Sequence, residues 1–401
     1  MAITKTMCGW LALRPRAGSS LAERIDPRYN SINALRLVLA FMVLVSHSIK
    51  FSTGGNDFVG TWTGSSVDLG TMGVDGFFAL SGYLIVGSFI SSPSASRYLW
   101  RRCLRILPGF WVCLVVTALV IGPVTALGSS GNAGDYAWTG PNSAVTYMRD
   151  NALLLIRQFG ITGGYGGQPA NASLYTLFYE FVCYLGVAAA GVLGLYRLHR
   201  SRVGLLVIAG WLLVLLALFA APTLIAGHTA REILLRYGSM FFFGGLAHFL
   251  AHRVRVFPVG FLAAAGLLAA GAAASGALSA ERGLVVYMFV APPAMAYLVL
   301  GLGASTRIAH IGAKRDLSYG LYVYAWPVQA SLLVLGASDW WLPVYIAISL
   351  VLSLALAYLS WTWIEAPALR LKSWNPTRRG RSPATTREHV PDDIFGQPNA
   401  S

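Results

Sequence analysis

The sequence predicts an all-α membrane protein, a polytopic bundle of about ten transmembrane helices with both termini in the cytoplasm. Of its 401 residues, 56 % are hydrophobic and only 11 % are charged, whereas about 25 % of residues are charged in a typical soluble domain. Long apolar segments recur along the chain, and basic residues gather between them. This distribution of the net charge of +14 is typical of membrane topology and excludes nucleic acid as the expected partner.

Ten segments are long and apolar enough to cross a hydrocarbon core of about 30 Å. Every second connecting segment is basic, and the side that carries these basic segments also carries both ends of the chain. Cytoplasmic loops are the ones enriched in Lys and Arg, so this side is predicted to be cytoplasmic. The predicted spans are 33–51, 71–91, 106–127, 173–196, 203–221, 233–251, 257–275, 283–303, 317–335 and 342–363.

Two regions lie outside the predicted membrane domain, residues 33–372, and a third interrupts it. Residues 1–32 form a basic cytoplasmic arm, and residues 373–401 are polar and expected to be disordered. Within the membrane domain, 33–372, residues 128–172 form the one long outer segment. An irregular segment of this length either closes over a site or is disordered.

The first span carries two ionisable side chains, Arg36 and His47, eleven residues apart. Eleven steps of a helix come to about three turns plus 20°, so both side chains leave the same face, about 16 Å apart along the axis. Snorkelling to the two interfaces is one explanation. Because ionisable groups inside a span are costly, the alternative is a functional site in which both line a common pore.

The second span, GVDGFFALSGYLI, contains small residues that suit close helix packing, among them Ser81. Asp75 in the same span needs a partner. It is expected either to orient an imidazole such as that of His47 or to meet interfacial water.

A basic cluster, Arg101, Arg102 and Arg105, lies in SRYLWRRCLRILPGF on one side of a short helix that enters the third span. One interpretation is topology alone. The other is a cytoplasmic polyanion site, because guanidinium groups bind phosphates through charge-assisted bonds. A nucleotide-bearing molecule such as coenzyme A would suit it. The four cysteines have no metal-ligand spacing, so no metal is expected.

Three later segments carry further candidates. Glu180 lies about two turns into the fourth span, where an aromatic interfacial belt does not explain a carboxylate. The segment LSYGLYVYAWPVQ contains Tyr319 and Trp326. In WIEAPALRLKS, Glu365 is expected to cap the cytoplasmic end of the last span.

Taken in order, R-x10-H, GVDGFFALSGYLI, RRCLRILPGFW, SLYTLFYEF, LSYGLYVYAWPV and WIEAPALRL resemble the acyltransferase 3 family over about residues 33–372. Members are integral membrane O-acyltransferases that modify envelope polysaccharides, lipids and other exported glycans. The resemblance implies an essential histidine at His47 and its arginine at Arg36, an acyl-CoA-associated arginine motif at Arg101–Arg105, and a terminal acidic residue at Glu365. The expected supporting residues are Asp75, Ser81, Glu180, Tyr319, Trp326 and Glu365.

The leading hypothesis is therefore a multi-pass O-acyltransferase of the bacterial cytoplasmic membrane, acetyl being the most frequent group in the family. Acyl-CoA is its donor substrate, with no tightly bound cofactor, and the acceptor is a glycan or glycolipid on the outer side. His47 would act either as a general base or as a transient acyl carrier. The alternatives are a transporter or flippase of a lipid-linked precursor, and a scaffold. The oligomeric state stays open.

Overall fold

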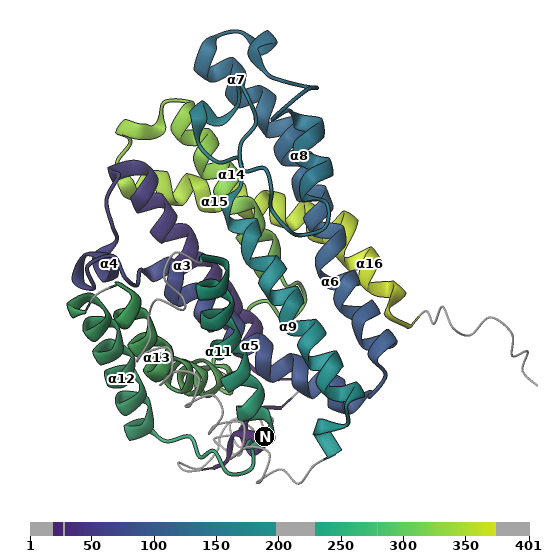
Figure 1. The fold of residues 1–401 in the computed structure, drawn as a ribbon, viewed down its shortest axis with the longest axis vertical. Helices are drawn as coiled ribbons and strands as arrows, with labels where there is room; N and C mark the ends of the chain where they lie inside the picture. The colour runs from purple at the N-terminus through teal and green to yellow at the C-terminus, as the bar shows by residue number, and fades with distance from the viewer. Residues whose placement is uncertain (1–18, 27–28, 198–228, 279, 374–401) are drawn as a thin grey trace, which may run out of the picture.

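The structure is a computed structural model that describes residues 19–26, 29–197, 229–278 and 280–373. This part of the chain is helical and contains a single isolated β-bridge but no strand. Seven of its helices are long and apolar enough to cross a membrane. Figure 1 shows most of them running roughly side by side as one bundle.

The helices, in chain order, are α2 (Leu21–Arg24), α3 (Ile32–Thr53), α4 (Phe58–Trp62), α5 (Leu69–Ser91), α6 (Ala95–Val116), the π-helix η1 (Thr117–Ile121), α7 (Gly122–Ser130), α8 (Ala144–Asn151), α9 (Tyr175–Val192), α11 (Thr229–Phe249), α12 (Pro258–Ala277), α13 (Ala280–Gly303), α14 (Ser318–Val334), α15 (Leu342–Ser360), the π-helix η8 (Trp361–Glu365) and α16 (Ala366–Arg370). Short 3₁₀ turns lie at Ala133–Asp135, Tyr165–Gly167, Ala172–Leu174, Leu195–Arg197, Ala337–Asp339 and Leu371–Ser373.

All predicted spans except one coincide with helices. The exception, 203–221, lies outside the described residues. Helices α11 and α14 occupy the sixth and ninth predicted spans but are not among the seven that qualify by length and composition, α14 having only 17 residues. A multi-pass helical membrane protein is thus confirmed, while the count of ten spans and the side of the termini stay predictions.

Two continuous helices are longer than predicted. Ala95–Ser129 has 35 residues and Leu342–Ser373 has 32, so the first is about 50 Å long at 1.5 Å per residue. Each contains one π-turn, at η1 and η8. The expected capping role of Glu365 is wrong, because the helix continues past it into α16 and the carboxylate makes no cap hydrogen bond.

Helix α5 lies in the middle of the bundle, packed against α3, α11 and α13. Glycines permit this packing. A Cβ atom at Gly82 would lie 1.9 Å from the carbonyl oxygen of Phe241, and one at Gly244 would lie 1.9 Å from that of Ala79. The backbones of α5 and α11 therefore touch, which confirms the packing interpretation of the small residues in the second span.

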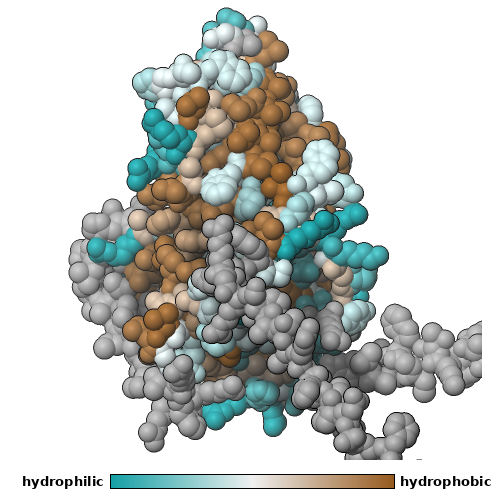
Figure 2. Space-filling model, turned by 90° about the vertical axis from the view of Figure 1, so that its right-hand side faces the viewer, coloured by the Kyte–Doolittle hydropathy of each residue, from teal (hydrophilic) through white to brown (hydrophobic). Residues whose placement is uncertain are grey.

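The surface of the bundle is apolar over a broad area, as Figure 2 shows for one face. Large hydrophobic side chains are exposed on several helices, including Leu262 of α12 at 75 % and Val351 of α15 at 64 %. Exposed apolar surface of this extent is expected where helices face lipid. The outer segment instead packs inward, burying Tyr136, Tyr147 and Tyr165.

Candidate active site

A charge network joins four segments at the Arg36 end of α3. Arg36 Nη1 lies 3.5 Å from Asp316 Oδ2, and Arg105 Nη2 of α6 binds the same oxygen. Arg105 Nη1 also lies 3.3 Å from Glu365 Oε2. Two arginines from distant parts of the sequence thus share one carboxylate, and a second carboxylate completes the partners of Arg105.

The carboxylates of this network are held by further donors. The Ser318 hydroxyl donates to Asp316 Oδ1 at 2.5 Å, and the Ser360 hydroxyl donates to Glu365 Oε1 at 3.1 Å. Burial raises the pKa of Asp316, but Arg36 and Arg105 outweigh it and hold that pKa well below its usual range. Asp316 therefore stays ionised and keeps both guanidinium groups in place.

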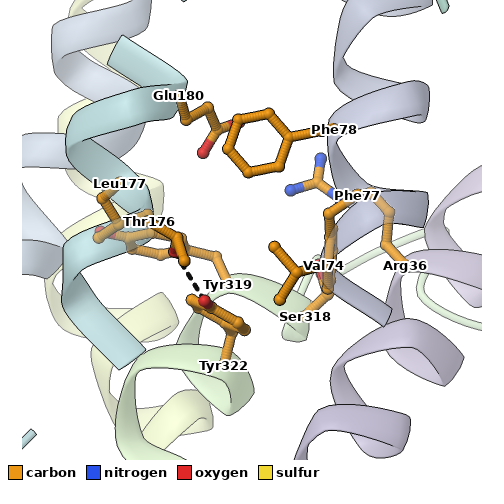
Figure 3. A pocket seen from close by; sticks show the side chains of 10 residues that line it. All are labelled: Arg36, Val74, Phe77, Phe78, Thr176, Leu177, Glu180, Ser318, Tyr319 and Tyr322. Carbon is orange, nitrogen blue, oxygen red and sulfur yellow. Dashed lines mark hydrogen bonds between the residues drawn. The ribbon is translucent and has the colours of Figure 1, made fainter. Parts of the chain in front are cut away.

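A small cavity lies beside Arg36, between α3, α5, α9 and α14 (Figure 3). The guanidinium of Arg36 and the carboxylate of Glu180 approach it from opposite sides. Its volume is about 40 Å³, room for about three waters since one needs about 10–15 Å³. Side chains must therefore move before an acyl chain enters. The lining residues are Arg36, Val74, Phe77, Phe78, Thr176, Leu177, Glu180, Ser318, Tyr319 and Tyr322.

Glu180 and Tyr319, two of the predicted supporting residues, line this cavity. Glu180 Oε1 accepts hydrogen bonds from the Ser81 hydroxyl at 3.0 Å and from the Tyr184 hydroxyl at 2.6 Å. Tyr319 donates its hydroxyl to the carbonyl oxygen of Ile106 at 2.8 Å, and its ring lies beside the Arg105 guanidinium. The first, second, fourth and ninth predicted spans therefore converge here.

His47 lies near the other end of α3 and contacts a different part of α14. Its ring centroid is 4.7 Å from that of Trp326, edge to face, and its Nδ1 is buried without a hydrogen-bond partner among the residues that the structure describes. Trp326 Nε1 donates to the carbonyl oxygen of Pro169 at 2.8 Å, which ties the outer segment to the histidine. His47 does not line the cavity at Arg36, so that cavity does not form the common pore expected from the sequence.

Asp75 serves neither of its expected roles. It is fully buried and accepts two hydrogen bonds from Arg236, at 3.1 and 2.8 Å, and one from the Tyr287 hydroxyl at 2.8 Å. These partners come from α11 and α13. The carboxylate therefore locks α5 to its neighbours and orients no imidazole.

Arg101 and Arg102 differ from Arg105 in lacking a carboxylate partner among the described residues. Arg102 Nη2 donates to the Ser88 hydroxyl at 3.1 Å. Lys372, at the end of the last helix, lies within electrostatic range of both arginines. The structure thus divides the predicted cluster into one arginine that is paired internally and two that remain available to an anion. No group of three potential metal ligands occurs among the residues described.

Sequence reasoning missed Asp316, Arg236 and Tyr287. Asp316 follows two basic residues in a connecting segment that was interpreted as a topology signal. Its position directly before a span with a hydroxyl two residues on, in DLS, was the available clue. Arg236 lies within the sixth predicted span, and an arginine within an apolar segment itself implies a buried partner.

Comparison with known proteins agrees with this arrangement. The model of the acyltransferase domain family, acyltransferase 3, matches residues 29–362. Nodulation protein 10 of Rhizobium leguminosarum bv. viciae is 28 % identical over 382 residues, which cover 89 % of this chain and 98 % of that protein. The O-acetyl transferase of Shigella phage Sf6 is 26 % identical over 349 residues, covering 84 % and 95 %. No solved structure matches. The chain belongs to the acyltransferase 3 family and is an O-acyltransferase.

Proposed function

We propose that this enzyme moves an acyl group from cytoplasmic acyl-CoA to a hydroxyl of an envelope glycan or glycolipid on the outer side of the bacterial cytoplasmic membrane. The observation that carries the proposal is the division of polar groups along α3. Arg36 and the α6 arginines lie at one end, and His47 lies at the other beside Trp326 and the outer segment.

Near the Arg36 end of α3, positively charged side chains form the proposed binding site for the donor. Arg101, Arg102 and Lys372 form a cationic surface without a carboxylate partner in the described residues, which suits the phosphates of coenzyme A. Arg105 was expected to bind the donor directly. Because Asp316 and Glu365 occupy its guanidinium, we assign it to positioning Arg36 and the start of α14.

At the acceptor end, His47 is the catalytic residue. As a general base, its imidazole takes the proton of the acceptor hydroxyl while that oxygen attacks the thioester carbonyl. The C–S bond then breaks, and the coenzyme A thiolate is protonated as it leaves. As an acyl carrier, the imidazole would attack the thioester first, forming an acyl-imidazole and releasing the coenzyme A thiolate. The acceptor hydroxyl would then take the acyl group and leave its proton on the freed imidazole. Both routes need the unprotonated ring.

A path between the two ends follows one face of α14. Tyr319 lies beside Arg105, Tyr322 lines the cavity, and Trp326 contacts His47. Their spacings of three and four residues place them on a single stripe of the helix. Rotation of these aromatic side chains would join the cavity to His47, which a donor thioester must reach.

The acyl group is most simply acetyl. The name of the phage relative is O-acetyl transferase, and acetyl needs the smallest enlargement of the cavity at Arg36. The test compares envelope glycans and lipids by mass spectrometry between a deletion strain and its complemented strain. One acetyl group per modified unit should disappear and return. An unchanged profile, with purified protein consuming no acyl-CoA, would instead favour a transporter or flippase.

The donor site has its own test. The double variant Arg101→Gln/Arg102→Gln should raise the KM for acyl-CoA more than the KM for the acceptor, and salt should reduce the difference from the wild type. Arg307→Gln is the matched control, since Arg307 is an exposed arginine of another connecting segment. Unchanged donor affinity in the correctly inserted double variant would return both arginines to a topological role.

A further inference from the structure

A second cavity lies between α11 and α13, away from the candidate active site. Its volume is about 260 Å³, and Leu21 of α2 is one of its lining residues. The walls are apolar side chains, including Phe243, Leu250 and Leu300. Tyr297 supplies the one hydroxyl, which donates to the carbonyl of Arg255 and accepts from the backbone N–H of Phe257.

This cavity suits an apolar occupant better than water. An apolar cavity of about 150 Å³ stays dry and binds a benzene-sized molecule, and this one is larger. It also reaches the surface, because Pro293 is exposed and Phe243 and Leu250 are only half-buried. A flexible hydrocarbon chain entering from the bilayer would fill it without leaving polar groups unpaired.

The segment that carries the lining residues Val254 and Val256, here called the rim, is basic in sequence and held in place. Leu21 N donates to Val254 O at 2.8 Å, and Val256 N donates to Ser19 O at 3.2 Å. Arg253 and Arg255 therefore flank the lining residue Val254 on a fixed segment. Both are exposed, and neither has a carboxylate partner among the described residues.

Glu23, the acidic residue of α2, forms no ion pair with this rim among the described residues. Glu23 of α2 accepts from Ser20 N at 3.0 Å in a capping box, which keeps its carboxylate on the helix end. An apolar cavity with two exposed arginines on its rim, both without a carboxylate partner in the described part of the chain, matches one amphipathic molecule, a chain with an anionic head.

We propose that this cavity binds one anionic membrane phospholipid, with an acyl chain between α11 and α13 and its phosphate against Arg253 and Arg255. In the orientation proposed above, the rim faces the cytoplasmic leaflet, which carries anionic lipid in many membranes. The bound lipid would fix the N-terminal arm to the bundle. The inference does not depend on the acyl-transfer reaction.

The test is native mass spectrometry of the full-length protein in detergent, titrated with phosphatidylglycerol or with phosphatidylcholine of the same chains. We expect one tight phosphatidylglycerol per protein and weaker phosphatidylcholine. Arg253→Gln/Arg255→Gln should weaken phosphatidylglycerol binding about 25-fold, because each basic group near an anionic headgroup contributes about fivefold. The control, Arg307→Gln/Lys314→Gln, removes two exposed charges elsewhere and should bind like the wild type.

A second pair of variants tests the cavity itself. Ala247→Phe fills it and should abolish the tight adduct for either lipid, whereas Ala265→Phe on the exposed face of α12 should not. Ala247→Leu serves if the larger side chain prevents folding. Equal wild-type binding of the two lipids, or a tight adduct that survives both fillings, would overturn the proposal. No tight adduct in the wild type would show that another occupant, such as a segment of this chain, fills the cavity.

Discussion

Replacing Asp316 by Asn should disrupt the Arg36 end of the bundle more than any other single neutral substitution there. Its carboxylate is the shared partner of Arg36 and Arg105, and the three side chains are only 22 %, 15 % and 14 % exposed, in the order Arg36, Arg105, Asp316. At 3.5 Å from Arg36, the attraction is about 5 kcal/mol with an effective dielectric constant of about 20. Removing one partner of a buried pair typically costs about 3–5 kcal/mol.

That cost converts to a measurable shift in melting temperature. An unfolding entropy of about 2.1 cal/mol/K per residue gives about 0.8 kcal/mol/K for a chain of 401 residues. Asp316→Asn should therefore lower Tm by about 4–6 °C, measured by tryptophan fluorescence of the purified protein in detergent. Asp339→Asn, an exposed acid outside any ion pair of the described residues, is the control.

The effect should also depend on pH. The pKa of Asp316 is lowered from its ordinary 3.8, so its contribution is complete above that value and is lost as the pH falls through the lower, folded-state pKa. The Tm difference between the wild type and Asp316→Asn should shrink as the pH falls below about pH 4. A variant that melts within about 1 °C of the wild type at pH 7 would refute the shared-carboxylate reasoning.

Two further outcomes follow from the contacts around the site. Arg236→Met leaves the Asp75 carboxylate buried without its cation and should lower the free energy of unfolding by about 3–5 kcal/mol. Adding Asp75→Leu should recover most of that loss, as measured by thermal unfolding. A double variant as unstable as the sum of the two single variants would contradict this pairing. Trp326→Ala should raise the KM for the acceptor but not for acyl-CoA, because the indole joins His47 to the outer segment. A change in donor KM alone would place Trp326 on the donor side.

Much of the fold could be predicted, because the length of each apolar segment and the charge of each connecting segment can be read directly from the local sequence. The helical period also placed Arg36 and His47 on one face, and both side chains do contact protein partners. The boundaries of α6 could not be predicted. Its arginine-rich first part is polar enough to suggest a separate helix, and Pro108 and Gly109 follow it, yet the helix continues through both residues into the apolar part.

The pairing within the site was less predictable, because it depends on how helices rotate against each other. Ser81 and Glu180, from the second and fourth spans, are joined by a hydrogen bond, and their supporting role stays a prediction. Asp75 was expected to orient an imidazole such as that of His47, because both residues lie near the predicted outer ends of their spans. Its true partner, Arg236, lies on a helix that glycine packing brings against α5, and no sequence period reveals that approach.

In the proposed mechanism, acyl-CoA binds on the side of Arg101 and Arg102, and its acyl group is transferred with the help of His47. Sealed membrane vesicles of both orientations separate the two faces. Inverted vesicles, with the cytoplasmic face outward, should take up label from external radiolabelled acetyl-CoA into an extractable glycan or glycolipid. Right-side-out vesicles should do so only after permeabilisation, if the proposed topology is correct.

The most direct measurement is this label transfer by inverted vesicles that contain the His47→Ala variant at the wild-type protein level. We expect a loss of about 10²–10⁴-fold, the usual contribution of a general base, with acyl-CoA affinity unchanged because Arg101 and Arg102 are intact. An alanine variant that keeps more than about a tenth of the wild-type transfer would contradict the role of His47 and with it the proposed mechanism.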